Sequence, residues 1–217
     1  MTDFAGAALT ETRVARIFLI GPPAAGKTVA TDYLLSHMLF SSHNLAHYSV
    51  ELAHRQLCPE SLSGDYAYDC DGALILHSPE TQVPEALALL ASQCRQSSQT
   101  GFIAELTHPS VATVFATFFA DLLSGSLIIH ISAPLGLRLA RNEARRCLRV
   151  PRSVVEAVGD VLSPAELRYF SSAGAQLISL SNTESIDSFR AKLEQLACSV
   201  TCAGRDNTTC VSGKDLT

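Results

Sequence analysis

The chain of 217 residues contains 47% hydrophobic and 17% charged residues, a balance typical of a compact folded protein and unlike that of a disordered chain. Its 16 Lys and Arg against 21 Asp and Glu give a net charge of −5, so there is no global basic field to hold a nucleic-acid backbone. At about 150 residues per domain, the length predicts a single domain. We expect residues 1–198 to form this domain and the polar residues 199–217 to form a C-terminal tail.

The distribution of apolar residues and of cysteines indicates the cellular compartment in which the protein folds. No apolar run reaches the length of about 18 residues that a membrane span needs, and the N-terminal residues lack the pattern of a signal peptide. The seven cysteines are odd in number and scattered, unlike the framework of a secreted disulfide-rich domain. We therefore expect a cytoplasmic protein with free thiols and no membrane partner.

Short apolar runs alternate with stretches of helical period along the chain. The expected strands are 14–20, 46–50, 101–106, 126–132 and 176–180. The expected helices are 28–39, 80–96, 109–123, 134–149 and 184–197. This alternation predicts an α/β fold with a parallel sheet. Residues 58–70 and 150–164 interrupt the alternation, and we expect both to be mobile pieces over a site.

The sequence Gly-Pro-Pro-Ala-Ala-Gly-Lys-Thr at 21–28 matches the phosphate-binding P-loop and lies between an expected strand and an expected helix. Its glycines let backbone N–H groups and a helix N-terminus approach phosphate oxygens. The Lys27 ammonium suits the β- and γ-phosphates, and the Thr28 hydroxyl suits Mg²⁺. A plain turn before a surface helix is the alternative, which the flanking elements disfavour. We expect ATP to contact Gly21, Pro22, Pro23, Ala24, Ala25, Gly26, Lys27, Thr28 and Val29.

A P-loop indicates the ligand but leaves the reaction open, because the same loop serves GTPases, motor ATPases and kinases. The chain lacks the guanine-reading sequence Asn-Lys-x-Asp and is short for a motor ATPase core. Small kinases are therefore the leading class.

Glu105 lies at the carboxyl end of the expected strand 101–106, the edge at which a parallel sheet meets its ligand. A carboxylate there can hold a Mg²⁺-bound water or take the proton from an attacking hydroxyl. A solvated loop acid is the alternative, but the apolar neighbours Phe102 and Leu106 favour a functional role. We predict that Glu105 is catalytic and that Thr28 and Glu105 are the metal-binding residues.

Six of the thirteen arginines fall between residues 138 and 152. On one continuous helix, Arg138, Arg141, Arg145 and Arg149 would occupy an arc of about 80°. A cationic face beside a mobile insertion suits a lid that clamps phosphates, whereas an ordinary solvated face more often mixes charge signs. We predict that Arg141 and Arg145, together with Lys27, stabilise the transferred phosphoryl group.

Together these features resemble the P-loop kinases related to nucleoside and nucleoside-monophosphate kinases. The resemblance runs from about Arg16 to Leu196 and rests on the P-loop, on Glu105, on residues 131–134 with the arginines after them, and on Leu-Ser-Asn-Thr at 180–183. It implies a three-layer P-loop NTPase fold whose five-stranded parallel sheet has the order 2-3-1-4-5. It also implies an arginine-bearing lid at about 150–164 and contacts of Arg138 and Asn182 with ATP.

At the acceptor site the sequence departs from this family. The acceptor-phosphate arginine motif of the monophosphate kinases and the Asp-Arg-Ser of the deoxynucleoside kinases are both missing. The candidate acceptor-binding residues are Glu51, Arg55, Asp69 and Asp71. The segment around the two aspartates could equally be a polar turn.

We predict an ATP-dependent phosphotransferase that acts on a hydroxyl or phosphate of a small nucleoside- or nucleotide-like acceptor. One alternative is a kinase of a hydroxymethylated base or an end of DNA, against which the net charge of −5 speaks. Another is an ATP-hydrolysing switch or assembly protein without an acceptor.

Overall fold

The computed structural model describes residues 16–37, 45–57, 66–68, 74–76, 79–98, 100–145, 150–183 and 185–202. Its parallel sheet consists of β1 (Arg16–Ile20), β2 (Ala46–Ser49), β5 (Phe102–Leu106), β6 (Leu127–Ser132) and β7 (Gln176–Ser181). The spatial order β2-β5-β1-β6-β7 is 2-3-1-4-5 when these strands are counted along the chain. The parallel sheet and its order are therefore confirmed.

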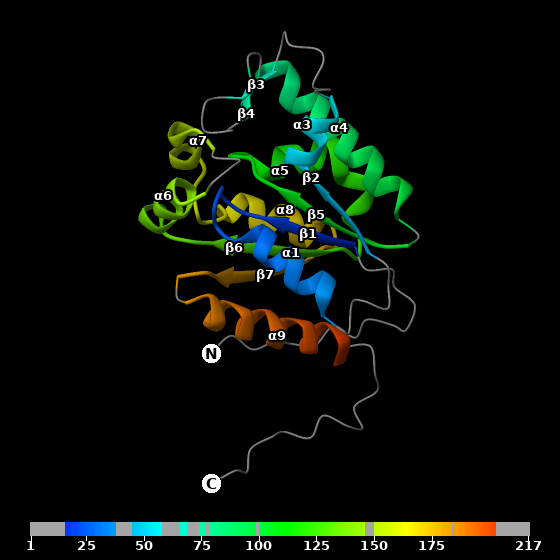
Figure 1. The fold of residues 1–217 in the computed structure, drawn as a ribbon. Helices are drawn as coiled ribbons and strands as arrows, with labels where there is room; N and C mark the ends of the chain where they lie inside the picture. The colour runs from blue at the N-terminus through cyan, green and yellow to red at the C-terminus, as the bar shows by residue number, and fades with distance from the viewer. Residues whose placement is uncertain are drawn as a thin grey trace.

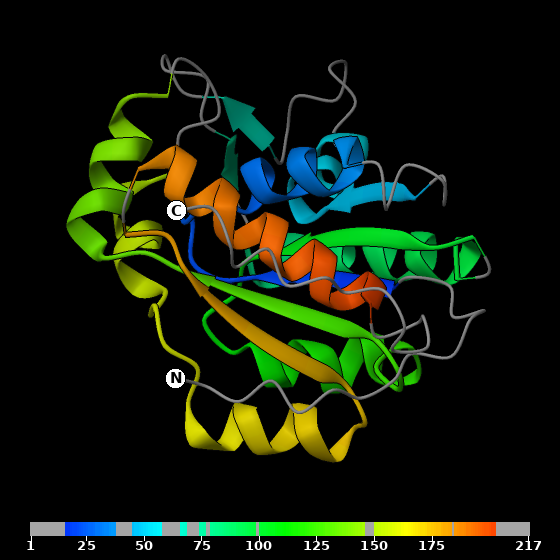
Figure 2. The ribbon, with the colours of Figure 1, turned by 90° about the horizontal axis from the view of Figure 1, so that it is seen from below.

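Helices cover both faces of this sheet (Figures 1 and 2). On one face lie α1 (Lys27–Ser36) and α9 (Ile186–Cys202). On the other lie α4 (Pro79–Gln96), α5 (Val111–Val114) and α8 (Pro164–Ser172), with α3 (Val50–Leu57) packed against α4. The three-layer arrangement is thus confirmed, and it places the loops that follow the strands at one open edge.

The central strand β1 is buried on both faces because its residues alternate between two apolar cores. Ile17 and Leu19 belong to the core under α1 and α9, and Phe18 and Ile20 belong to the core on the other face. The Phe18 ring lies 4.9 Å from the Phe115 ring, centroid to centroid, at an angle of 78°. This edge-to-face packing holds β1, and therefore the loop that follows it, in a fixed position.

The expected helix over 109–123 is present from Val111 to Leu122, but it is not a regular α-helix. The segment begins as α5, continues as a π-helical turn at Phe115–Phe119 and ends as a 3-10 turn at Ala120–Leu122. A π turn is wider than an α turn and shifts the positions that follow it. Phe115 and Phe119 are both fully buried and both contact Phe18. Aromatic packing therefore overrides the regular helical period.

The expected helix 134–149 also ends early, since α6 spans Leu135–Glu143. The buried Asn142 side chain donates to the Val150 carbonyl oxygen at 2.8 Å and accepts from the Val150 N–H at 2.9 Å. These two bonds draw residue 150 back to the last turn of α6. Arg145 therefore lies beyond the helix and does not continue its face, and Arg149 falls outside the described residues.

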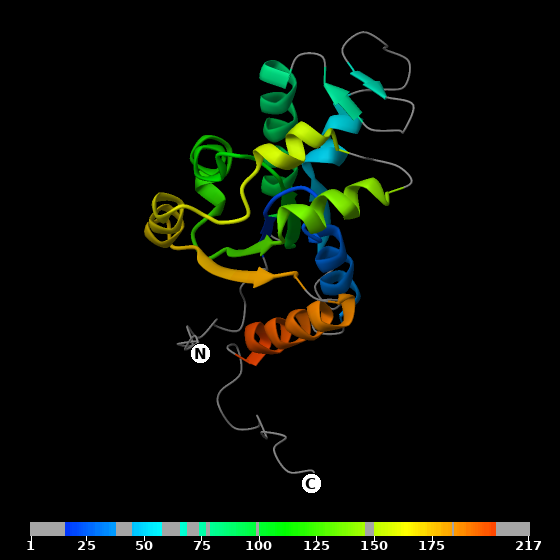
Figure 3. The same cartoon turned by 90° about the vertical axis from the view of Figure 1, so that its left-hand side faces the viewer.

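The expected lid segment contains α7 (Arg152–Ala157), which contacts α6 at the carboxyl edge of the sheet (Figures 1 and 3). A short antiparallel hairpin of β3 (Tyr66–Tyr68) and β4 (Leu74–Leu76) belongs to the same end of the molecule. Asp69 and Asp71 lie outside the described residues. Helix α9 continues to Cys202, four residues into the expected tail.

Within the described ranges, no helix is both long enough and apolar enough to cross a lipid bilayer.

Candidate phosphoryl-transfer site

The P-loop connects β1 to α1 and depends on glycine at two positions. Gly21 and Gly26 have φ angles of 141° and 108°, which L side chains rarely adopt. A Cβ on Gly21 would overlap the Ile131 carbonyl oxygen, and a Cβ on Gly26 would overlap the Asn182 side-chain amide. Both glycines therefore let the loop lie against the carboxyl ends of β6 and β7.

Lys27 is folded over this loop. Its Nζ donates to the carbonyl oxygens of Gly21 at 2.9 Å and Pro22 at 2.8 Å. Burial lowers the pKa of Lys27 to about 8; the charge of Glu105 opposes this shift, and those of Arg145 and Arg138 add to it. The ammonium group is thus held at the phosphate-binding loop, within the electrostatic reach of two arginines.

Glu105 stands at the centre of a polar cluster beneath α1. Its Oε2 accepts from the Thr28 hydroxyl at 3.1 Å, and its Oε1 accepts from the Thr31 hydroxyl at 2.8 Å. The His47 Nε2 lies 2.9 Å from the same Oε1. Because β2 and β5 are parallel and His47 is paired with Ile103, His47 shares a face of the sheet with Glu105. Side chains from α1 and β2 therefore converge on the carboxylate that β5 carries.

The hydrogen bonds decide the charge state of Glu105. Burial raises its pKa, but the hydrogen bonds from His47 and Thr31 and the charges of His47 and Lys27 outweigh that effect, so the pKa falls below its ordinary value. A carboxylate that is ionised and tied by three donors is a weak proton acceptor. The geometry therefore suits charge and metal binding better than general-base chemistry.

The pair formed by Thr28 and Glu105 fits a magnesium ion. A hydroxyl and a carboxylate are the hard oxygen donors that Mg²⁺ prefers, and Mg²⁺ typically uses few protein ligands together with substrate phosphates and water. The hydroxyl at the first turn of α1 and the carboxylate at the end of β5 are already in contact. These are the residues that would hold the ion.

Asn182 joins the P-loop to α6. Its Nδ2 donates to the Ala25 carbonyl oxygen at 2.8 Å, and its Oδ1 accepts from Arg141 Nη2 at 3.1 Å. Arg141 Nη1 is buried and has no hydrogen-bond partner among the described residues. A cationic donor left unsatisfied beside a phosphate-binding loop fits an anion. Asn182 and Arg141 are thus brought together at the site, although the Nδ2 and Oδ1 atoms of Asn182 both already have protein partners.

The other two predicted arginines take different positions. Arg138 is buried, and its Nε and Nη1 donate to the carbonyl oxygens of Ala133 at 3.0 Å and Val155 at 2.7 Å. It therefore ties α7 to the start of α6. Arg145 follows α6 and acts on Lys27 through its charge. The contact of Arg138 with ATP stays a prediction.

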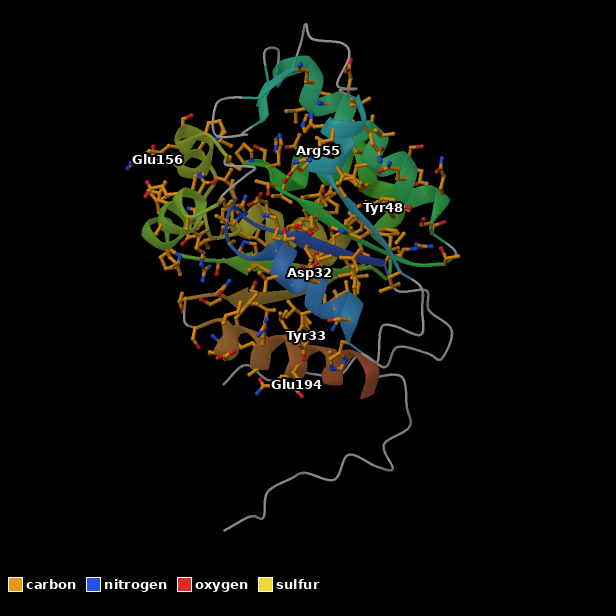
Figure 4. The ribbon with its side chains drawn as sticks, viewed as in Figure 1. Asp32, Tyr33, Tyr48, Arg55, Glu156 and Glu194 are labelled. Carbon is orange, nitrogen blue, oxygen red and sulfur yellow. The ribbon has the colours of Figure 1, made fainter. Side chains whose placement is uncertain are left out.

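The predicted acceptor residues Glu51 and Arg55 form a pair on α3. Arg55 Nη2 donates to Glu51 Oε1 at 3.3 Å, and both side chains are exposed. Figure 4 shows Arg55 on α3, well apart from Glu156 on the outer side of α7. The structure thus brings these two acceptor candidates together without linking them to the P-loop.

Sequence reasoning missed Thr31, His47 and His130. A usable signal existed for Thr31, since spacing i, i+3 from Thr28 places the two hydroxyls on one face of a helix. His47 sits in a short strand with no distinctive pattern, and His130 interrupts the apolar run of β6. Their roles depend on which strands become neighbours, which the local sequence does not encode.

No family model and no curated protein sequence matches the chain. Solved structures do match it. An unliganded sugar kinase from Janibacter sp. has 13% sequence identity and a TM-score of 0.55, covering 88% of this chain and 99% of its own. A shikimate kinase from Acinetobacter baumannii in complex with shikimate has the same identity and TM-score, covering 88% and 95%.

A third structure, a putative kinase from Chloroflexus aurantiacus, has 16% identity and a TM-score of 0.51, covering 85% of this chain and 98% of its own. At such low identity the likeness shows the fold. The chain therefore has the P-loop kinase fold over most of its length.

Proposed function

We propose that this protein is an ATP-dependent phosphotransferase that moves the γ-phosphoryl group of ATP to a small-molecule acceptor. The observation that carries the proposal is the contact between Thr28 and Glu105 directly below a P-loop whose lysine is buried at the loop. This combination gives one site a phosphate-binding backbone, a mobile cation and an oxygen pair suited to Mg²⁺.

Each group has a role that follows from its place. The N–H groups of the loop and of the first turn of α1 bind the phosphates, and the glycines bring the backbone close. Lys27 exchanges its two carbonyl partners for phosphate oxygens, which are stronger acceptors because they are charged. Magnesium held at Thr28 and Glu105 supplies charge neutralisation on the phosphates.

The arginines complete the electrostatic environment. Arg141 has an unsatisfied Nη1 beside the loop, and Arg145 acts on Lys27 through its charge. Both are placed to stabilise the negative charge that spreads over the phosphoryl oxygens during transfer. In the transfer itself, an acceptor oxygen forms a bond to the γ-phosphorus while the bond from that phosphorus to the β–γ bridging oxygen breaks. ADP keeps the electron pair, and a hydroxyl acceptor releases its proton to water.

The P-loop kinase fold supports a small-molecule kinase, and the resemblance to nucleoside and nucleotide kinases suggests an acceptor of that shape with a hydroxyl or phosphate to phosphorylate. Glu51 and Arg55 stay candidates at its far end, because their exposed pair on α3 is free to contact a ligand.

The test follows labelled γ-phosphate from ATP with Mg²⁺ and a panel of small acceptors. The proposal predicts label in an organic product. It also predicts that Lys27→Ala lowers transfer at least a hundredfold, because a charge on the developing phosphoryl centre is lost. Label found only as free phosphate with every acceptor would favour a nucleotide-dependent switch.

A further inference from the structure

A small cavity lies directly behind the start of the P-loop. It has a volume of about 70 Å³, and its lining includes Gly21, His108, His130, Gly159 and Glu166. Gly21 follows β1, His108 follows β5, and His130 lies near the end of β6, so the cavity opens at the carboxyl edge of the sheet. Ligands of open α/β sheets bind at this edge. The volume admits a few water-sized groups, which is enough for the reacting part of a small molecule.

His130 contributes a largely buried imidazole to the lining of this cavity. Its side chain is 5% exposed and makes no hydrogen bond within the described residues. Polar side chains in a protein interior normally have hydrogen-bond partners. An imidazole that lines a cavity and bonds to no described residue is therefore suited to bind a polar group there.

His108 supplies a second group of defined polarity. Its Nδ1 accepts a hydrogen bond from the Ser110 N–H at 3.0 Å. The proton of the neutral ring is therefore on Nε2, which is a hydrogen-bond donor. Burial lowers the pKa of His108, and burial with the charge of Lys27 lowers that of His130 against the opposing charges of Glu166 and Asp160. Both rings are thus neutral near pH 7.

The charges around the cavity discriminate between acceptors. Its lining includes the Glu166 carboxylate and no lysine or arginine from the described residues. Glu166 Oε2 accepts from the N–H and hydroxyl of Ser163, and its Oε1 has no partner within the described residues. The adjacent Lys27 is bonded to Gly21 and Pro22 on the P-loop side. A carboxylate or phosphate would meet repulsion here, whereas a hydroxyl can donate to Glu166 and accept from His108.

We propose that this cavity binds the phosphoryl acceptor and that the acceptor presents an uncharged, hydroxyl-bearing part to it, as a sugar, polyol or nucleoside does. The inference rests on the proposed function and narrows it, because it excludes an anionic group next to the reacting hydroxyl. His130 and His108 are then specificity-determining residues, and the phosphorylated hydroxyl points past Gly21 toward Lys27.

Gly159 provides a direct test. Gly159 lines the cavity, and a Cβ built on it has no heavy atom within 4 Å, so a larger side chain fits beside the cavity without displacing the backbone. Gly136 in the first turn of α6 is a matched control, because a Cβ there also meets nothing within 4 Å and Gly136 does not line the cavity. The variants are Gly159→Leu, Gly136→Leu, His130→Leu and His130→Gln.

Transfer from ATP is measured with three matched acceptor pairs: ribose and ribose 5-phosphate, glucose and gluconate, and uridine and its monophosphate. Binding of a non-hydrolysable ATP analogue is measured separately. We expect wild type to transfer phosphate to at least one uncharged member. The variants Gly159→Leu and His130→Leu should each raise the KM for that acceptor at least tenfold. We expect Gly136→Leu to stay within twofold of wild type and His130→Gln, which keeps a donor and an acceptor, to stay within threefold. ATP-analogue binding should be the same in all four variants.

The outcomes separate this inference from the proposed function. With ATP-analogue binding intact, the inference is overturned by transfer to the anionic members alone, by absence of transfer to every uncharged member, or by an unchanged KM in Gly159→Leu and His130→Leu. If the wild-type protein does not bind the ATP analogue, that result would contradict the proposed function itself, and this inference with it.

Discussion

The Thr28 hydroxyl donates a hydrogen bond to the Glu105 carboxylate at 3.1 Å, although 77 positions separate the two residues in the chain. The contact exists because β1 and β5 are neighbours, so the helix that follows β1 begins beside the end of β5. Phosphate binding and metal binding are thereby brought into one site.

Replacing Glu105 tests its charge separately from its hydrogen bonds. Glu105→Gln keeps an oxygen acceptor for Thr28 or Thr31 but removes the negative charge, so we expect kcat to fall about a hundredfold or more. The apparent Mg²⁺ affinity in a titration of transfer rate should fall as well. A Glu105→Gln protein that melts within a few degrees of wild type and still transfers phosphate at the wild-type rate would contradict a metal-binding role.

His47 acts through Glu105, since its Nε2 lies 2.9 Å from Oε1. We expect His47→Ala to lower kcat roughly fivefold to tenfold and to leave the acceptor KM unchanged. The reason is that the Glu105 carboxylate is held less firmly without the imidazole contact. His47→Gln offers an amide donor and should recover most of the loss. Steady-state kinetics at saturating Mg²⁺ give both constants. Equal losses in the alanine and glutamine variants would show that the hydrogen bond is unimportant.

The sequence predicted the parts that local pattern controls. The apolar run before Gly21 marks a strand buried on both faces, and the P-loop motif follows from short-range chemistry alone. By contrast, α6 ends at Glu143 because Asn142 binds the backbone of Val150, and the α5 segment is broken by the packing of Phe115 and Phe119 against Phe18. These contacts depend on tertiary structure.

Some missed elements did carry local signals. Helix α8 begins with a capping box in which Ser163 and Glu166 bond reciprocally, a pattern visible in the sequence Ser-Pro-Ala-Glu. Helix α3 carries the pair Glu51 and Arg55 at spacing i, i+4. The role of His47 was beyond local reasoning, because its contact with Glu105 requires β2 and β5 to be adjacent.

The lowered pKa of Lys27, about 8 against a usual 10.5, predicts a pH dependence of ATP binding. The free protein loses the ammonium proton as pH rises through about 8, while bound phosphate favours the charged form and raises the pKa again. The Kd of an ATP analogue should therefore rise by up to about tenfold per pH unit above 8. Lys27→Met should remove most of this slope. A wild-type Kd that is constant from pH 7 to 9.5 would contradict the shift.

The lowered pKa of Lys27 also affects folding stability, which should rise with pH whereas ATP binding should weaken. Between about pH 8 and 10.5 the unfolded chain binds the Lys27 proton and the folded chain does not. The free energy of unfolding should therefore gain a stabilising contribution as pH rises through that window. Comparing denaturant unfolding of wild type and Lys27→Met across the window isolates it. The prediction would be contradicted if the free energy of unfolding of wild type fell relative to that of Lys27→Met as pH rises through this window.

Asn182 should matter more for stability and Arg141 more for ligand binding. Asn182→Ala removes the partners of the Ala25 carbonyl oxygen and of Arg141 Nη2, so we expect a loss of about 1–3 kcal/mol in the free energy of unfolding. Arg141→Ala should weaken ATP-analogue binding about tenfold with a smaller stability loss. Denaturant unfolding and binding titrations on both variants separate the two effects, and an Arg141→Ala protein with wild-type affinity would remove this arginine from the site.

A calorimetric titration of the protein with a non-hydrolysable ATP analogue and Mg²⁺ tests directly whether the P-loop binds ATP. Lys27→Met removes the ammonium at the P-loop, and Lys192→Met makes the same chemical change on α9, where Nζ donates to the Ser181 carbonyl oxygen. We predict saturable binding by wild type and Lys192→Met, and a Kd at least thirtyfold higher for Lys27→Met. Absence of binding by wild type, or equal affinity in all three proteins, would contradict this prediction.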